Sequence, residues 1–296
     1  MKHFVLPVLA ALSIATAAMA EDVTIATAQG DATVPANPGK VVVYDVAAID
    51  TLKALGVPLA GVPDNLYIPG LDAGDAPTVG TLFEPDLEAL AGIAPDLIVV
   101  GGRSVTQLGA VSKIAPAIDM TIGTDLIADA EARITAYGTI FGLEDKAAEL
   151  NNDIDTRLAD LKAAGEGKGT ALIVMTNGTK MAAYGPGSRF GWLHTQTGLA
   201  PAIADLNTEE NHGNVLTHEA IAEANPDWLF VLDRGVAVGE EGASAEQTLK
   251  TPLVEGTNAW KNGNVVYLPA AELYIAGGGV TSLEAVIDTL TAALNK

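Results

Sequence analysis

Short apolar runs alternate with stretches of helical periodicity along most of the chain. Runs typical of strands lie at 23–26, 41–44, 59–62, 97–100, 171–176, 181–184, 228–232 and 265–268. Helical stretches lie among them, at 48–55, 87–91, 190–197, 219–224 and 282–294. Strand alternating with helix is typical of a mainly parallel sheet, so the pattern predicts an α/β fold.

One helical stretch is much longer than the others. Within 144–165, Leu150, Ile154, Leu158 and Leu161 recur at three- and four-residue steps, which predicts an amphipathic helix with one apolar face. A glycine-rich segment ends this helix, and the α/β alternation then starts again. We therefore expect two α/β lobes with mainly parallel sheets, joined by a single long helix.

The N-terminal residues have the pattern of a secretory signal peptide. Met1-Lys2-His3 is a basic start, 4–18 is uncharged and mostly apolar, and Ala18-Met19-Ala20 fits a small-x-small cleavage site. The apolar run is too short for a comfortable membrane span. No cysteine follows it to carry a lipid anchor. We expect export, most simply to a bacterial periplasm.

These observations divide the chain into four parts. The expected boundaries are a signal peptide at 1–20, an N-terminal lobe at 21–143, a connecting helix at 144–165 and a C-terminal lobe at 166–296.

Composition and charge exclude several classes of function. The 296 residues include no cysteine, which excludes disulfides, thiolate metal sites and a cysteine nucleophile. Acidic residues outnumber basic ones 37 to 16, giving a formal net charge of −21. Such a surface repels phosphate backbones, so no nucleic-acid partner is expected.

An internal repeat supports two similar lobes. Glu88 stands fifteen positions before Arg103, and Glu219 stands fifteen positions before Arg234. In both cases a Pro-Asp pair and an apolar strand lie between them. A helix–Pro-Asp–strand connection is common in α/β proteins, but the matching arginine after each strand is more specific. Ligands bind beyond the carboxyl ends of such strands, and two facing edges make a cleft.

The arginines are the most informative residues in so acidic a chain. There are five, of which Arg133 and Arg157 fall in helical stretches and are expected to be solvated. Arg103, Arg189 and Arg234 follow strands directly or after a short turn. One such arginine would be an ordinary surface charge, whereas three favour a shared anionic ligand. Guanidinium offers a planar fork of donors to paired oxygens and stays charged when desolvated.

The turn that carries Arg189 is not a nucleotide site. Gly185-Pro186-Gly187 resembles the start of a dinucleotide fingerprint, but Gly191 comes one position too late. We interpret the segment as a turn that exposes Arg189.

Histidine and tyrosine provide candidate metal ligands. His194 is expected to pack inside a helix, and His218 to lie at a helix start. His212 lies in a polar loop, and Tyr274 closely precedes the glycines 277–279. Imidazole suits many transition metals, and phenolate binds ferric haem iron. Neither residue decides the function alone.

Together these features resemble the periplasmic substrate-binding proteins of ABC importers for ferric siderophores, in the branch that takes catecholates of the enterobactin type. The resemblance covers essentially the whole chain after the signal peptide, and 185–191 is its most specific motif. The matching stretches are 41–56, 79–88, 95–103, 184–192, 225–234, 258–268 and 274–283.

The resemblance implies roles for particular residues. Arg103, Arg189 and Arg234 would hold the catecholate oxygens. His212 and Tyr274 would complete the iron shell when a siderophore offers four donors.

It also implies partners for the chain. Glu88 and Glu219 would lie on the tops of the two lobes and dock onto basic residues of an inner-membrane permease. Fe(III) would arrive as part of the ligand, with no intrinsic cofactor and no enzymatic activity, and we expect a monomer.

Three other functions are to be weighed at this point. A periplasmic haem carrier would use Tyr274 and His212 as axial ligands. Haem has only two propionates, however, so one of the three arginines would have no anionic partner. A periplasmic metal-dependent hydrolase would need a metal held by carboxylates and histidines, but the chain has no H-E-x-x-H motif. A pure interaction module would leave the three strand-end arginines unexplained.

Overall fold

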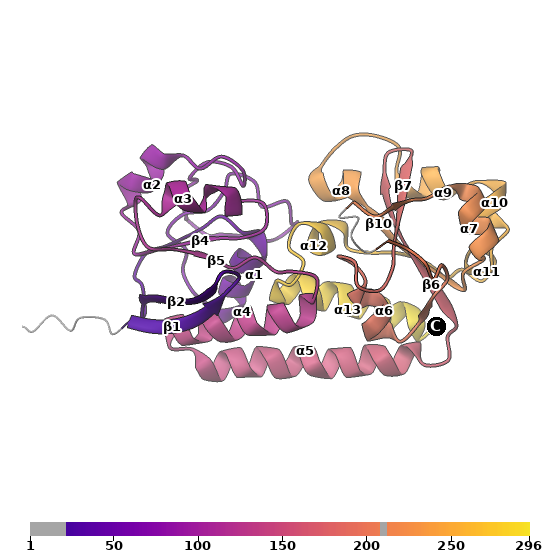
Figure 1. Cartoon of the computed structure of the whole chain (residues 1–296), viewed down its shortest axis with the longest axis horizontal. Helices are drawn as coiled ribbons and strands as arrows, with labels where there is room; N and C mark the ends of the chain where they lie inside the picture. Colours follow the sequence, from indigo (N-terminus) through magenta and orange to yellow (C-terminus); the bar gives the residue numbers. More distant parts are fainter. Residues whose placement is uncertain (1–21, 208–211) are drawn as a thin grey trace, which may run out of the picture.

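The computed structural model describes residues 22–207 and 212–296. The predicted signal peptide at 1–20 lies outside these residues. Figure 1 shows two groups of strands and helices side by side, with one long helix running beneath both.

The first group is built on a small parallel sheet. Its strand order is β3-β4-β5, with Val41 opposite Leu97 and Val99 opposite Ile118. A separate antiparallel hairpin, β1-β2, precedes it. The elements are β1 (Asp22–Thr27), β2 (Gly30–Pro35), β3 (Val41–Val43), α1 (Val46–Leu55), α2 (Leu87–Ile93), β4 (Leu97–Val100), the 3₁₀ turn η1 (Val105–Gln107), α3 (Leu108–Val111), β5 (Ala117–Asp119) and α4 (Leu126–Phe141).

The second group is built on a mixed sheet of order β11-β10-β6-β7-β9, with β8 beside β6. Strands β11, β10 and β6 are parallel, whereas β7 is antiparallel to β6 and to β9. Its strands are β6 (Thr170–Asn177), β7 (Lys180–Tyr184), β8 (Ala200–Pro201), β9 (Asn214–Val215), β10 (Trp228–Asp233) and β11 (Val265–Tyr267). Its helices are α6 (Trp192–Thr197), α7 (His218–Ala224), α8 (Arg234–Val238), α9 (Ala245–Leu249), α10 (Pro252–Glu255), α11 (Asn258–Lys261), α12 (Ala270–Tyr274) and α13 (Val280–Leu294).

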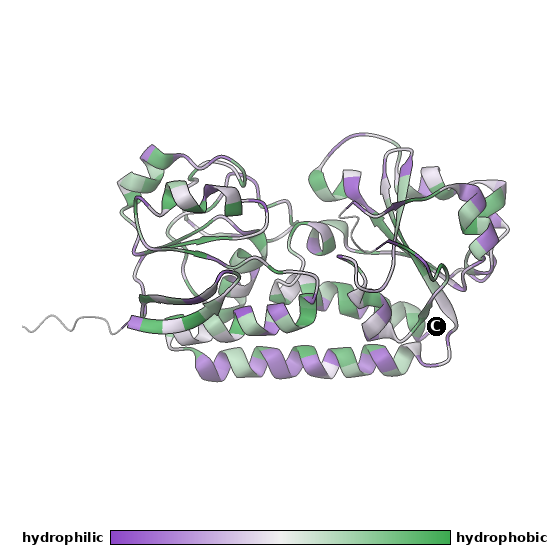
Figure 2. Cartoon of the chain, viewed as in Figure 1, coloured by the Kyte–Doolittle hydropathy of each residue, from purple (hydrophilic) through white to green (hydrophobic). Residues whose placement is uncertain are grey.

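The long helix α5 (Glu144–Gly165) packs against α4, α6 and α13. Ile154, Leu158 and Leu161 are buried, and they belong to one hydrophobic cluster that extends into both sheets. Figure 2 shows purple and green alternating along α5, as its apolar face requires. The core therefore continues from one lobe to the other.

The internal repeat is visible in the hydrogen bonds. The carboxylate of Asp96 accepts from the Lys40 amide just before β3, at 2.8 Å, and Asp227 accepts from the Thr170 amide at the start of β6, at 2.9 Å. Each Pro-Asp pair thus ties its strand to the neighbouring parallel strand. The same geometry then delivers an arginine beyond the end of β4 and of β10.

Several expectations differ from the structure. The predicted strand at 59–62 forms only the single bridges Val42–Gly61 and Val62–Thr78, too few for a ladder. The predicted elements did not include the strands β2, β5, β8 and β9, the helix α4, or the short helices α3, α8, α9, α10, α11 and α12. Arg133, on α4, is buried rather than solvated, because its guanidinium donates to the carbonyls of Ala26 (3.3 Å) and Thr121 (3.1 Å).

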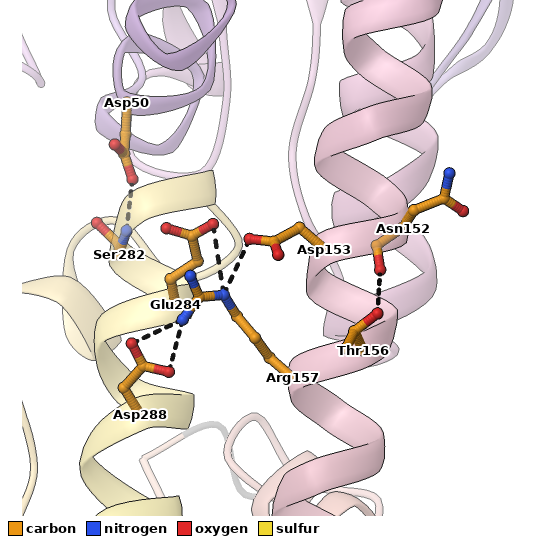
Figure 3. Close-up of polar contacts among 8 residues, drawn as sticks. All are labelled: Asp50, Asn152, Asp153, Thr156, Arg157, Ser282, Glu284 and Asp288. Carbon is orange, nitrogen blue, oxygen red and sulfur yellow. Dashed lines mark hydrogen bonds and ion pairs between the residues drawn. The ribbon is translucent and has the colours of Figure 1, made fainter.

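Helix α13 is fixed to both the first lobe and the long helix. Asp50 of α1 is 1% exposed and accepts hydrogen bonds from the Ser282 amide, at 2.8 Å, and the Thr281 hydroxyl. Arg157 of α5 pairs with Asp288 at 2.7 Å, as Figure 3 shows. It also pairs with Asp153 and Glu284. Gly279 permits the close approach of Asp50, since a Cβ there would meet its Oδ2 at 2.5 Å.

Removing this carboxylate is expected to destabilise the fold. Asp50→Ala leaves the Thr281 hydroxyl and the buried Ser282 amide without their acceptor. This loss should lower the free energy of unfolding by about 1–3 kcal/mol. Asp153→Ala is the control, because its ion pair is exposed and should contribute less than about 1 kcal/mol. Urea unfolding of both variants measures the difference. Equal losses would contradict the anchoring role of Asp50.

Candidate functional site

Three arginines from different parts of the chain converge on one tyrosine. Arg103 follows β4, Arg189 lies in the turn after β7, and Arg234 begins α8 directly after β10. Their guanidinium carbons lie 5.2, 4.6 and 6.0 Å from the centre of the Tyr274 ring. The predicted strand-end arginines therefore share one site.

The 185–191 motif folds as a compact turn that directs Arg189 towards the site. The Ser188 hydroxyl donates to the carbonyl of Gly185 at 2.6 Å, which closes the turn. Glycine is needed at 191, because a Cβ there would lie 2.6 Å from the Gly185 carbonyl oxygen. Phe190 is buried, and the Arg189 guanidinium lies 5.0 Å from the centre of its ring.

Two of the arginines are anchored by the backbone at the end of α12. Arg103 donates to the carbonyls of Tyr274 (2.8 Å) and Ile275 (3.2 Å), and Arg189 donates to the same Tyr274 carbonyl at 2.6 Å. Residues from before and after α5 therefore meet on one oxygen. Carbonyls at a helix C-terminus carry partial negative charge, which favours guanidinium there.

Arg234 is held by side chains instead. It pairs with Glu240 at 2.9 Å and donates to the Asn177 side-chain oxygen at 3.4 Å. Among residues 22–207 and 212–296, Arg234 forms an ion pair, whereas Arg103 and Arg189 do not.

The charges alter the acidity of the tyrosine. Burial alone raises the pKa of Tyr274, but a hydrogen bond with Arg234 and the charges of Arg189, Arg234 and Arg103 outweigh it. The net pKa is below the ordinary value of 10.0. Burial lowers the pKa of Arg103, and the neighbouring charge of Arg189 lowers it further. The arginines therefore make the phenolate of Tyr274, the form that binds ferric iron, more accessible than that of an isolated tyrosine.

A cavity of about 680 Å³ opens beside this cluster on the side of the second lobe. Arg234, Tyr274 and the exposed His212 line it, so the structure brings the two proposed iron ligands to one cavity. The cavity is also lined by Met175, Asn177, Thr179, Lys180, Met181, Ala182, Gly213, Val215 and Leu216.

Two further cavities differ in their relation to the arginines. One of about 90 Å³ is lined by Arg103, Arg189 and Asp45, on the side of the first lobe. The other, of about 460 Å³, is lined by parts of α1, the 68–72 segment and the start of α13, and none of the three arginines lines it. The candidate site therefore comprises the cavities of about 680 Å³ and about 90 Å³, which the arginines line.

Among the described residues, the other two histidines have structural roles. His194 is 5% exposed, and its Nδ1 lies 3.3 Å from the Leu199 carbonyl oxygen. His218 begins α7, and its Nε2 donates to the Thr248 carbonyl at 2.8 Å. In the part of the chain that the structure describes, no group of three or more His, Asp and Glu side chains could hold a metal ion.

Comparison with known proteins identifies the family. The model of the family described as "Periplasmic binding protein" matches residues 41–272. The chain belongs to the periplasmic binding protein family. Members of this family bind substrates, so the chain is a binding protein and not an enzyme.

Individual relatives agree in sequence and in structure. The petrobactin-binding protein YclQ of Bacillus subtilis (strain 168) is 37% identical over 270 residues, covering 89% of this chain and 84% of YclQ. The structure of YclQ matches with a TM-score of 0.86 and 36% identity, over 93% of this chain and 99% of that chain. These matches confirm the predicted α/β fold class.

Two Vibrio proteins are also similar. The structure of the periplasmic catecholate-siderophore binding protein VctP of Vibrio cholerae matches with a TM-score of 0.84 and 30% identity, over 92% of this chain and all (100%) of that chain. The ferric-anguibactin-binding protein FatB of Vibrio anguillarum is 28% identical over 275 residues, covering 88% of this chain and 84% of FatB.

The two glutamates proposed for docking lie away from this site. Glu88 is exposed in the first turn of α2, and Glu219 is exposed in the first turn of α7. The two helices belong to different lobes of this binding protein, as Figure 1 shows. Neither glutamate lines the cavities that adjoin the arginines.

Sequence reasoning missed several residues that line the site. Lys180 and Asn177 line the large cavity, and Asp45 lines the small one. The pair Gly178-Thr179 fits a two-residue hairpin turn with glycine at its first position, a signal that could have placed Lys180 opposite Asn177. No comparable signal in the sequence places Asp45 near the arginines. Among residues 22–207 and 212–296, no helix is long and apolar enough to cross a membrane.

Proposed function

We propose that this chain captures a ferric catecholate siderophore between its lobes and delivers it to an inner-membrane ABC permease for iron uptake. The observation that carries the proposal is the convergence of Arg103, Arg189 and Arg234 around Tyr274 beside a cavity of about 680 Å³. The names of YclQ, VctP and FatB, which refer to petrobactin, a catecholate siderophore and ferric anguibactin, support it.

The chemistry of the arginines favours a catecholate. A ferric catecholate is anionic and presents paired oxygens, which match the donor fork of guanidinium. The overall charge of −21 would repel such a ligand, so a local group of cations is needed to hold it. Fe(III) is then part of the cargo and not a resident cofactor.

The proposal includes the route and organisation of the chain. Residues 1–20 would be a cleaved signal peptide that sends the protein to the periplasm. Residues 21–143 and 166–296 would act as the two lobes, with 144–165 as the helix that connects them. The protein would work as a monomer, with Glu88 and Glu219 facing the permease.

Tryptophan fluorescence tests the substrate class directly. Trp192 is buried in α6, three residues after Arg189, and reports on the site. Titration with ferric enterobactin or a ferric bis-catecholate should quench the emission, whereas haem and Zn²⁺ should not. Saturable quenching by haem but not by the ferric catecholates would reject the proposal in favour of a haem carrier.

The proposed iron ligands make a separate prediction. A tetradentate bis-catecholate leaves two ferric coordination positions open, which His212 and Tyr274 would fill. A cationic metal favours the phenolate, although tyrosine ordinarily titrates near about 10. The double variant His212→Ala, Tyr274→Phe should therefore lose affinity for tetradentate complexes and keep most of its affinity for hexadentate ones.

The two classes of complex act as controls for each other. Fluorescence titration of the double variant with a ferric bis-catecholate and with ferric enterobactin measures both affinities. Equal losses would mean that His212 and Tyr274 contribute through packing or hydrogen bonding and not through coordination.

A further inference from the structure

One face of the β6-β7 pair leads from the core into the large cavity. Residues two apart on a strand share a face, so the successive cross-strand pairs belong together. These pairs are Ile173–Tyr184, Met175–Ala182 and Asn177–Lys180. The first pair is fully buried, and the last two line the cavity. The face therefore changes from apolar to cationic as it reaches the rim.

The rim of this face is a rigid turn. Asn177 and Lys180 close the hairpin, with Gly178 at a φ of 57° between them. The Thr248 hydroxyl donates to the Gly178 carbonyl at 2.8 Å, and His218 donates to the Thr248 carbonyl at 2.8 Å. The backbone that carries Lys180 is thus fixed from behind by α9 and α7.

Lys180 lies close to one of the site arginines. It is the cross-strand neighbour of Asn177, a relation that places the two Cβ atoms about 4.5–5.5 Å apart. Asn177 in turn accepts from Arg234 at 3.4 Å. Within the described residues, the Lys180 ammonium has no hydrogen bond and no ion pair. An unpaired cation on a fixed turn is available to a ligand in the cavity.

We infer that Lys180 and Asn177 form a second anion-binding subsite, which receives a carboxylate on the backbone of the bound ferric catecholate. This inference rests on the proposed function and narrows the ligand to catecholate siderophores that carry a carboxylate on their backbone. The arginines around Tyr274 take the iron-bound oxygens. The organic backbone extends over Met175 and Ala182, where a thioether suits an aromatic or aliphatic group. Its carboxylate accepts from the Lys180 ammonium and the Asn177 amide.

Two matched probes test the subsite. They are the ferric complexes of two bis-catechols with the same linker, one carrying a free carboxylate on the linker and the other its methyl ester. Lys180→Gln should weaken the carboxylate complex about five- to tenfold, the range for one charge-assisted hydrogen bond at a part-exposed site. It should change the ester complex less than about twofold, the difference expected where no charge pair is lost.

Lys250→Gln is the control variant, because Lys250 is also exposed on the second lobe and lines no part of this cavity. It should leave both affinities unchanged. Equal weakening of both complexes by Lys180→Gln, or no weakening of either, would overturn the subsite and leave the proposed function intact. Failure of the unaltered protein to bind either ferric complex would overturn both.

Discussion

Arg103→Ala, Arg189→Ala and Arg234→Ala are each expected to weaken binding of a ferric catecholate by well over tenfold. Each change removes one partner of a charge pair that is desolvated in the complex, a loss of about 2–5 kcal/mol. The effect should be largest for Arg103 and Arg189, which are anchored on the Tyr274 carbonyl. Arg234 already pairs with Glu240, so part of its attraction for the ligand is offset.

Arg157→Ala is the matched control for these variants. Arg157 is an arginine of the same chain, but its partners are Asp153, Glu284 and Asp288 on α5 and α13. Its removal should change the free energy of unfolding by no more than about 1 kcal/mol and leave the affinity unchanged. Fluorescence titration of all four variants with a ferric bis-catecholate decides the matter. An affinity loss for Arg157→Ala as large as for the others would refute the site.

The sequence predicted those parts of the fold that depend on local pattern. The strand 97–100 and the helix 144–165 were predicted with the bounds that the structure has, because an unbroken apolar run and a regular three- and four-residue repeat leave little ambiguity. The segment 59–62 has the same apolar character as a strand. It forms single bridges instead, because pairing depends on what lies beside it and not on its own residues.

The site shows the same division. The three arginines stood out because each follows a strand, and the topology brings such ends together. The burial of Arg133 could not be predicted, because its acceptors are carbonyls of distant segments, Ala26 and Thr121. The same holds for the anchoring of Arg103 on the end of α12, more than 170 residues away in the sequence. Every residue has a backbone carbonyl, so the sequence does not show which carbonyl will accept a hydrogen bond from an arginine.

The second large effect is expected in uptake and not in binding. The double variant Glu88→Arg, Glu219→Arg should keep its ferric-siderophore affinity and its fold, yet stop uptake in cells. Both glutamates are exposed at helix starts, where a carboxylate stabilises the fold by only about 0.3–1 kcal/mol. Their equivalent places in the two lobes would let a permease with basic residues engage both lobes at once.

The control must change the charge equally on another face. Glu149→Arg with Glu166→Arg does so, since Glu149 is exposed on α5 and Glu166 is exposed at the position that follows this helix. Charges at the rim of an interface chiefly steer encounter and fix register, so reversing the docking pair should turn attraction into repulsion. Reversing the control pair, Glu149 and Glu166, should leave uptake near normal. Radioactive iron uptake in cells measures both variants beside fluorescence titration of the purified proteins. Normal uptake by the docking variant would contradict the assignment, and so would loss of its siderophore affinity, because neither Glu88 nor Glu219 touches the ligand in the proposed complex.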